Sequence, residues 1–340
     1  MQISVRALAA AAAAILFSGT PLTVQAAPAA ASGGCQDIAI QIPQGTIAST
    51  LCLPASGTAD TVMVLVSGSN YNATYWDWSY QPETYNFRQA MNRAGYATLT
   101  ADRLGNGAST HPFSLSLTAG ATAEAQHTMV QGLRAGLAGN KPFAKVVIAG
   151  HSLSSSTSVQ EATTYHDVDG VLLTGYSHAL SIADVLGVIS TYHQAVEDPV
   201  FAGRGLDAGY LTTRPGTREQ DFFGEGNFDP EVVALDEATK ETFSLSEYPD
   251  GLVYTLPGPS ANITAPVMLV NGSKDRLACG TAFAICTDAA ALYTAESQYF
   301  SQSARLRTFV LAGSGHAINL ARNTTDYQQA VIDWMRSISG

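Results

Sequence analysis

Short, continuous apolar segments recur along the chain, and each ends in small or polar residues. They cover residues 61–66, 96–100, 145–149, 170–173, 267–270 and 307–311. Uninterrupted runs of Val, Ile and Leu of this length are typical of strands buried on both faces of a parallel sheet. Ahead of them, residues 37–53 alternate between polar and apolar side chains around a Pro-Gln-Gly turn. This alternation predicts an antiparallel hairpin.

Segments with helical periodicity lie between the apolar runs. Apolar residues recur at helical spacing at Phe87 and Met91, over residues 129–137 and over residues 327–338. Asn323 or Thr324 is a suitable N-cap for the last helix. The alternation of strands and helices predicts a doubly wound α/β sheet, in which ligands bind at the carboxyl ends of the strands.

The alternation stops between about residues 181 and 261. This stretch contains a helical segment at 182–196, a polar region rich in Gly and Pro, and a second helical segment at 230–243. Because it interrupts the sheet pattern without starting a new one, we expect a mainly helical lid inserted into one domain that covers residues 37–340.

The composition favours one folded domain and argues against a nucleic-acid partner. Hydrophobic residues make up 46% of the 340 residues and charged residues 13%, which is enough apolar material for one large core. The formal net charge is −11, and no Lys/Arg-rich segment offsets it. A surface of this charge repels phosphate backbones.

Residues 1–26 predict a signal peptide for export. Arg6 supplies the positive charge, residues 7–17 form the apolar segment, and Val-Gln-Ala at 24–26 provides small residues for cleavage. The apolar segment is too short to span a membrane as a helix, and no later one is long enough, so we expect no membrane span. An uncleaved anchor is the less favoured alternative. We expect residues 27–36 to be a flexible leader and the protein to be secreted, either extracellular or periplasmic.

Four cysteines occur in the sequence. An even number in an exported protein suggests two disulfides, and three pairings are possible. We expect the local pairing, because each pair then brackets a short segment: Cys35 with Cys52, and Cys279 with Cys286. A metal site is the alternative, but it lacks the C-x-x-C spacing and a matching histidine.

A serine directly follows one of the predicted buried strands. Val-Val-Ile-Ala at 146–149 runs into Gly150-His151-Ser152-Leu153-Ser154. A nucleophilic serine on a sharp strand-to-helix turn is held in a strained backbone conformation, with its hydroxyl exposed above the sheet. The positions two before and two after it must be small, as Gly150 and Ser154 are, although the usual second residue is Gly. An ordinary turn after a strand is the alternative interpretation.

An acid and a histidine follow two later predicted strands. Asp275 ends the segment Asn-Gly-Ser-Lys-Asp, and His316 ends the segment Ala-Gly-Ser-Gly-His. The order Ser152, Asp275, His316 predicts a catalytic triad, in which His316 takes the serine proton as general base. Asp275 fixes the histidine tautomer and stabilises the imidazolium that forms. Taken singly, the two residues could also be a turn carboxylate and a solvated loop histidine.

Over residues 37–338 the chain resembles the α/β-hydrolase superfamily, and its lipase- and esterase-like members in particular. The resemblance rests on the three residues above and on residues 102–109, which are similar to the family's Asp-x-x-Gly-x-Gly-x-Ser loop, a mainly structural element. It implies the α/β-hydrolase fold and two backbone donors for an oxyanion. One is the N–H of Leu153. Alignment of Ser67-Gly68 with the family's His-Gly pair makes Ser69 the second, with Asn70 as the alternative.

The resemblance implies a serine hydrolase that cleaves a carboxylic ester, lactone or thioester of a small-molecule substrate without a metal or organic cofactor, and the signal peptide implies that it is secreted. The same triad could serve a peptidase, an acyltransferase or a cofactor-free haloperoxidase-like enzyme. A non-enzymatic binding module on a hydrolase scaffold is a less favoured alternative. Five aromatic residues after the first core strand could line a pocket or pack on the core: Tyr71, Tyr75, Trp76, Trp78 and Tyr80. For His178 we expect a structural polar role.

Overall fold

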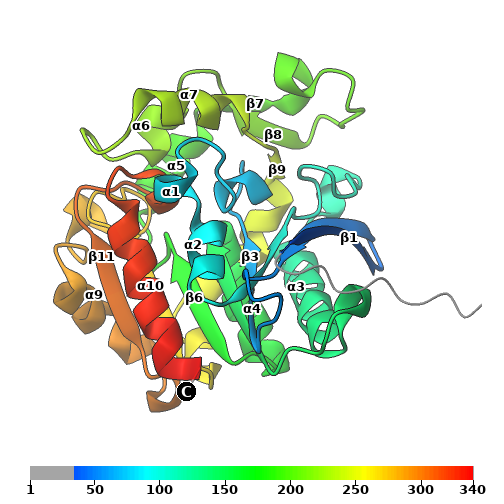
Figure 1. Ribbon diagram of the computed structural model, residues 1–340. Helices are drawn as coiled ribbons and strands as arrows, with labels where there is room; N and C mark the ends of the chain where they lie inside the picture. Colours follow the sequence, from blue (N-terminus) through cyan, green and yellow to red (C-terminus); the bar gives the residue numbers. More distant parts are fainter. Residues whose placement is uncertain (1–33, 340) are drawn as a thin grey trace, which may run out of the picture. The chain divides into compact units, whose positions relative to one another are not determined.

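The computed structural model describes residues 34–339, which contain a mostly parallel sheet of eight strands (Figure 1). The strand order is β1-β2-β4-β3-β5-β6-β10-β11. Strands β1 and β2 form the predicted antiparallel hairpin, β2 also pairs antiparallel with β4, and the other pairs are parallel. The bounds are β1 Cys35–Ile42, β2 Gly45–Cys52, β3 Thr61–Val66, β4 Ala97–Ala101, β5 Lys145–His151, β6 Gly170–Thr174, β10 Val267–Gly272 and β11 Arg307–Leu311.

The central strands are apolar along their whole length because both faces of the sheet are covered. Every residue of β3, β4, β6 and β10 is buried. Successive side chains point to opposite faces, so Val62 and Val64 join one core cluster while Met63 and Leu65 join the other. The continuous apolar runs of the sequence are therefore parallel strands, as predicted.

Helices cover each face of this sheet. Met129 of α3 (Ala119–Arg134) and Val159 of α4 (Leu153–Tyr165) belong to the first cluster, as does Leu292 of α9 (Ala289–Glu296). The second cluster includes Phe87 of α2 (Phe87–Arg93) and Trp334 of α10 (Thr324–Ser339). The short helix α1 (Pro82–Tyr85) directly precedes α2 in the chain. The α/β-hydrolase fold and its doubly wound sheet are thus confirmed. The predicted periodicity extended this helix to Leu137, but α3 ends three residues earlier, at Arg134. It ends there because Gly136 takes a left-handed conformation.

The chain between β6 and β10, called here the inserted segment (residues 175–266), lies across one end of the sheet (Figure 1). It is mainly helical, with α5 (Ile182–Ile189), α6 (Arg218–Phe222), α7 (Pro230–Ala238), α8 (Tyr248–Gly251) and several 3-10 turns. It also contains a three-stranded antiparallel sheet that the sequence did not predict: β7 (Tyr192–Gln194), β8 (Tyr210–Thr213) and β9 (Phe243–Ser244). Strands of two to four residues are too short to produce a recognisable alternation.

Two disulfides connect the cysteines in the expected local pairs, Cys35 with Cys52 and Cys279 with Cys286. Cys35 lies opposite Cys52 in the β1–β2 register. Cys35 and Gln36, the last two residues of the expected leader, therefore belong to the hairpin. The predicted signal peptide and the rest of the leader lie outside the described residues. Within residues 34–339, no helix is both long and apolar enough to cross a membrane.

Candidate active site

Ser152 occupies a sharp turn between β5 and α4. Its backbone has φ 55° and ψ −123°, a conformation that costs energy for any residue with a side chain. Hydrogen bonds hold the turn in place: Ser152 N–H donates to Thr174 O at 2.8 Å, and Ser155 Oγ donates to Gly150 O at 2.9 Å. Strain that is fixed in this way is typical of a nucleophile position.

Ser154 departs from the glycine that is usual two residues after the nucleophile, and the structure explains how the turn accommodates it. The Ser154 hydroxyl donates a 2.6 Å hydrogen bond to Ser67 O, in the loop after β3. The extra side chain therefore connects the turn to that loop.

Two glycines allow backbone segments to approach at this end of the sheet. A Cβ on Gly68 would lie 2.8 Å from Ser152 Cβ, and a Cβ on Gly272 would lie 2.3 Å from Gly315 O. Real Cβ atoms essentially never come this close to other heavy atoms. Glycine is therefore required both beside Ser152 and between the loops that carry Asp275 and His316.

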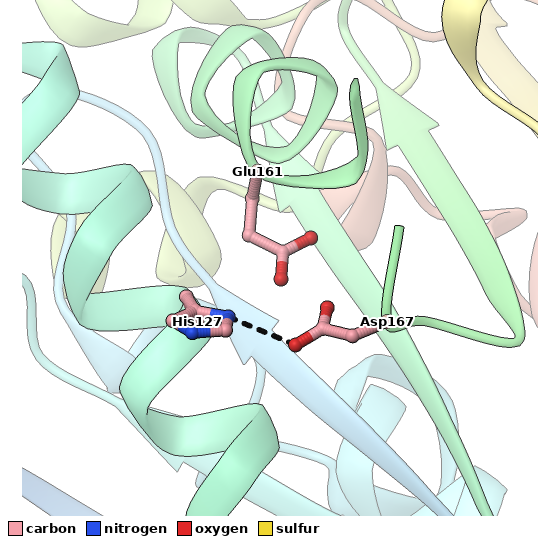
Figure 2. A group of neighbouring side chains, drawn as sticks. All are labelled: His127, Glu161 and Asp167. Carbon is pink, nitrogen blue, oxygen red and sulfur yellow. Dashed lines mark hydrogen bonds and ion pairs between the residues drawn. The ribbon is translucent and has the colours of Figure 1, made fainter. Parts of the chain in front are cut away.

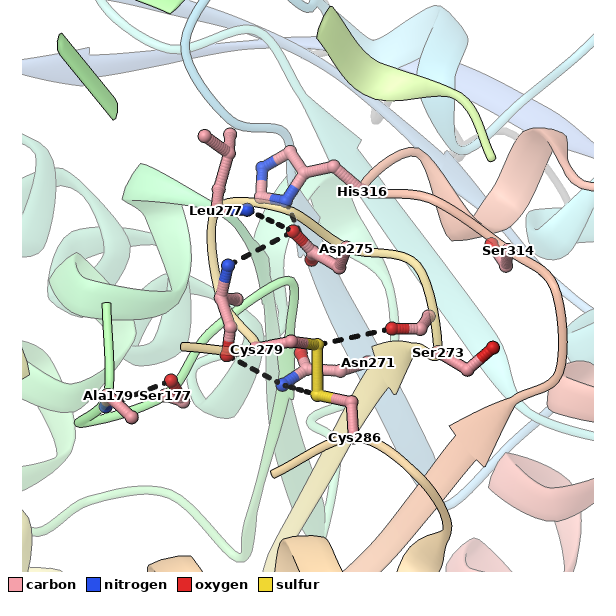
Figure 3. The surroundings of a disulfide bond; sticks show 12 residues. Ser177, Ala179, Asn271, Ser273, Asp275, Leu277, Cys279, Cys286, Ser314 and His316 are labelled. Atoms are coloured by element: carbon pink, nitrogen blue, oxygen red, sulfur yellow. Dashed lines mark hydrogen bonds and ion pairs between the residues drawn. A yellow bond between two sulfur atoms is a disulfide. The ribbon is translucent and has the colours of Figure 1, made fainter. Parts of the chain in front are cut away.

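Asp275 and His316 meet at the carboxyl ends of β10 and β11 (Figure 3). Asp275 Oδ2 lies 2.8 Å from His316 Nδ1, and Asp275 Oδ1 accepts hydrogen bonds from the N–H groups of Leu277 and Ala278 at 2.9 and 3.0 Å. Both side chains are buried. Because a carboxylate only accepts, the proton of the neutral imidazole is on Nδ1 and the lone pair is on Nε2.

His316 Nε2 is buried and has no hydrogen-bond partner among residues 34–339. Ser152 and His316 line the same pocket, although no hydrogen bond joins them in this structure. The free lone pair of a buried imidazole thus borders the pocket that Ser152 also lines.

The two expected oxyanion donors line this pocket as well. Ser69 and Leu153 both border it, whereas Asn70 does not. Within the described chain, neither backbone N–H donates a hydrogen bond to another residue. Asn70 instead has a positive φ of 62° and donates from its side chain to the hydroxyl of Tyr192 at 2.9 Å.

The pocket is narrow and mostly apolar. Its cavity volume is about 50 Å³, which is room for a few water molecules. Part of its wall comes from the inserted segment. The apolar and aromatic residues that line it are Tyr71, Leu153, Tyr176, Leu180, Val185, Val188, Tyr192, Phe222, Tyr248, Leu252 and Leu277.

A buried arginine connects the inserted segment to the loop that carries Ser69. Arg218 is fully buried, and it donates to both carboxylate oxygens of Asp236 at 2.5 and 3.0 Å. Its third contact is a 3.3 Å hydrogen bond to Asn70 O, and its guanidinium lies 4.4 Å from the centre of the Tyr71 ring. Burial acts to lower the pKa of Arg218, but the charge of Asp236, its hydrogen bond to Arg218 and the nearby Tyr71 and Glu237 together outweigh burial and raise that pKa.

His151 is a residue of this site that the sequence analysis did not assign a role. It is fully buried and stacks on Tyr75 with ring centroids 4.4 Å apart, while its ring centroid is 4.8 Å from that of His316. Burial, and then the charge of His316, hold the pKa of His151 well below its usual value. The only sequence feature that pointed to His151 was its position directly before Ser152 in Gly-His-Ser.

The remaining candidates have structural surroundings. Tyr75, Trp76 and Trp78 are buried in the core, and of the five aromatic residues only Tyr71 lines the pocket. His178 is buried with Nδ1 2.6 Å from Glu296 Oε2, outside the pocket lining. Asp102 accepts backbone hydrogen bonds from Ala73 and Ala108, as a turn carboxylate does.

Comparisons with known proteins agree with this architecture. The model of the Alpha/beta hydrolase family matches residues 63–331. A search of curated proteins found no match. Among solved structures, a highly thermostable carboxyl esterase from Bacillus coagulans is 17% identical, with a TM-score of 0.61 over 90% of this chain and 99% of that one.

Two further solved structures are similar at the same level. A thermophilic esterase from Thermogutta terrifontis is 16% identical, with a TM-score of 0.57 over 89% of this chain and 99% of that one. A putative lipase from Acinetobacter baumannii is 14% identical, with a TM-score of 0.58 over 90% and 92%. At these identities the likeness shows a common fold.

Proposed function

The chain belongs to the alpha/beta hydrolase family, and from this we propose that it is a secreted serine hydrolase that cleaves a small carboxylic ester through an acyl-enzyme. The observation that carries the proposal is the state of His316. Its Nδ1 is bound to Asp275, while its buried Nε2 has no partner and borders the pocket that Ser152 lines. A general base needs this arrangement.

In the proposed reaction Ser152 Oγ attacks the acyl carbon of the ester, and His316 Nε2 takes the serine proton. The carboxylate of Asp275 stabilises the imidazolium that forms. His316 then gives its proton to the departing alcohol, and a water molecule, activated by His316, hydrolyses the acyl-enzyme. A lactone or thioester would react by the same steps.

The N–H groups of Leu153 and Ser69 are the proposed donors to the oxyanion. Both border the pocket and neither donates a hydrogen bond to another described residue. Donors that are already oriented need no reorganisation when negative charge develops on the acyl oxygen. Loss of one such donor typically lowers kcat by about 10²–10³-fold.

The pocket supports a substrate with a short acyl chain. A cavity of about 50 Å³ holds a few water molecules, so a longer chain would require the inserted segment to move. The two disulfides support an exported protein, because such bonds persist in oxidising compartments. The predicted signal peptide gives the same localisation.

The mechanism is tested by replacing Ser152 with Ala. We expect Ser152→Ala to lose labelling by a fluorophosphonate probe and to lower kcat on p-nitrophenyl acetate by about 10⁴-fold or more, with unchanged circular dichroism. Ser190→Ala, which removes an exposed hydroxyl at the end of α5, is the control and should keep full labelling. Persistent turnover in Ser152→Ala would refute the assignment.

The substrate class is tested with a panel of p-nitrophenyl esters and aminoacyl-p-nitroanilides. We expect kcat/KM to be highest for acetate or butyrate and to fall for octanoate, with no measurable cleavage of the anilides. Labelling of Ser152 combined with anilide cleavage would instead identify a peptidase that uses the same residues.

A further inference from the structure

Three side chains that could bind a metal converge on the face of the sheet that α3 and α4 cover. They are His127 of α3, Glu161 of α4 and Asp167 of the loop between α4 and β6 (Figure 2). Each offers one ligand atom, and the three atoms lie within 4.8 Å of one another. Glu161 is nine residues beyond Ser152, or about 13 Å along the helix axis, so this cluster is separate from the candidate active site.

The burial of the Glu161 carboxylate is not offset by a hydrogen-bond donor in the described fold. Its side chain is fully buried, and no N–H group among the described residues donates a hydrogen bond to either carboxylate oxygen, although the Asp167 carboxylate lies within hydrogen-bonding reach. Figure 2 shows this carboxylate pointing from α4 toward the space between His127 and Asp167. A buried carboxylate without a donor is costly, and a bound cation is one physical way to offset that cost.

The other two side chains border the same space from its more exposed side. His127 Nδ1 lies 2.8 Å from Asp167 Oδ2, and these side chains are 29% and 15% exposed. The second oxygen of Asp167, Oδ1, is buried and without a partner. Solvent can therefore reach the cluster from the side of His127 and Asp167, whereas Glu161 forms its buried side.

The residues around the cluster hold its members in place. The Tyr165 ring stacks on His127 with centroids 3.7 Å apart, and Gln131 donates to Asp167 Oδ2. Arg134 is the nearby cation, but it is engaged with Asp167 O and the Asp169 carboxylate.

We propose that His127, Glu161 and Asp167 bind one Zn²⁺ ion, with water as the fourth ligand. An imidazole nitrogen with two carboxylate oxygens suits zinc, whereas Ca²⁺ and Mg²⁺ prefer oxygen ligands alone. With zinc–ligand bonds of about 2.0–2.2 Å, tetrahedral ligand atoms lie about 3.3 Å apart. The 2.8 Å between His127 Nδ1 and Asp167 Oδ2 would have to open slightly to reach this value, and spacings of up to 4.8 Å would have to close.

Such an ion would stabilise the fold rather than take part in ester hydrolysis. It would join α3, α4 and the loop that leads into β6, through ligand residues that lie 34 and 6 positions apart in sequence. Binding to the folded chain alone raises its stability by mass action. The proposal is independent of the proposed esterase activity, because its readouts are binding and melting.

The test uses the purified protein without a histidine tag, after dialysis against EDTA. Titration with ZnCl₂ should show one bound ion per chain, and zinc at 100-fold above its Kd should raise Tm by about 5 °C. Glu161→Gln keeps the shape but removes the negative ligand, so it should bind zinc at least 10-fold more weakly and lose the Tm increase.

His166→Asn is the matched control. This histidine neighbours Asp167 and is exposed, and asparagine tolerates its left-handed backbone conformation. The variant should bind zinc as the wild type does. Absence of zinc binding by the wild type, equal binding by Glu161→Gln, or loss of binding in His166→Asn would overturn the proposal. In the first case, Glu161 is simply a protonated acid beside Asp167.

Discussion

His151 and Ser152 are adjacent in sequence but lie in different environments. Ser152 borders the pocket, whereas the His151 side chain is fully buried between the Tyr75 ring and the region of His316. Catalysis would make His316 an imidazolium. A second positive charge on the neighbouring His151 ring would repel it, so His151 has to be neutral. The lowered pKa of His151, caused by burial and by His316, satisfies this requirement.

The first prediction concerns the stability of the protein in acid. Below the unfolded-state pKa of about 6.5, the unfolded chain protonates residue 151 while the folded chain resists it, so stability falls as pH falls. Between pH 7.5 and 5 this costs up to about 2 kcal/mol. His151→Gln should therefore lose less unfolding free energy over that interval, measured by urea denaturation at both pH values.

The control is again an exposed histidine. His166→Asn should retain the acid sensitivity of the wild type, because its imidazole stays in contact with water in both states. The groups that contact His151 in the fold are Tyr75, Tyr71, Thr174 and His316, and all are retained in both variants. Equal acid sensitivity of His151→Gln and the wild type would show that burial of His151 does not contribute.

At the scale of elements, the loop after β10 is closed by the Cys279–Cys286 disulfide, just beyond the residues that orient Asp275 (Figure 3). Leu277 and Ala278 donate their backbone N–H groups to Asp275 Oδ1. Beneath them, the Asn271 side chain donates to Tyr176 O. The disulfide thus limits the motion of the segment that fixes the carboxylate.

The second prediction compares the two disulfides. Cys279→Ser/Cys286→Ser should lower kcat by about 10-fold or more, since misplacing a catalytic group by an ångström can cost up to about 100-fold. Cys35→Ser/Cys52→Ser, which opens the β1–β2 hairpin remote from the pocket, should lower Tm but leave kcat unchanged. Each loss should reduce stability by about 2–3 kcal/mol. Unchanged kcat in the first variant would contradict the positioning role.

The sequence predicted those elements whose burial is uniform. Strands β3, β4, β6 and β10 are buried on both faces, which leaves an unbroken apolar run. Ser152 and Asp275 were proposed from their place after the apolar runs of β5 and β10, and His316 from its place after β11, an edge strand that is only partly buried. The short strands β7–β9 left no such pattern. The pairing of Arg218 with Asp236 was not predictable either, because side chains on two short helices meet only through the tertiary fold.

Contacts between residues that are distant in sequence were not predicted, for the same reason. The Ser154–Ser67 hydrogen bond spans 87 residues, and Glu161 meets His127 across two separate helices. In each case the sequence contains the residue types but no spacing that connects them. The start of β1 at Cys35 was also missed, because the disulfide that extends the hairpin gives no periodic signal.

At the scale of the whole molecule, the pocket lies between the loops of the large sheet and the inserted segment. The sheet and its loops supply Ser152 and His316, and the inserted segment supplies Val188, Tyr192 and Phe222. Arg218 is one of several residues that connect them: it binds Asp236 within the inserted segment and Asn70 O in the loop that follows β3.

The third prediction tests this connection. Arg218→Met should destabilise the protein by about 3–5 kcal/mol, because it leaves Asp236 buried without its partner. Arg218→Met/Asp236→Leu should regain most of that loss, since an apolar pair of similar volume needs no desolvation of charge. Both variants lack the guanidinium donor to Asn70 O, which then keeps only its 3.1 Å hydrogen bond from the N–H of Glu241. Both should therefore show a raised KM for a short ester if Arg218 is needed to position the loop after β3. If the double variant has the stability and KM of the wild type, the only role of Arg218 is to neutralise the charge of Asp236. If it is as unstable as Arg218→Met, the guanidinium is needed for its hydrogen bonds and for packing on Tyr71.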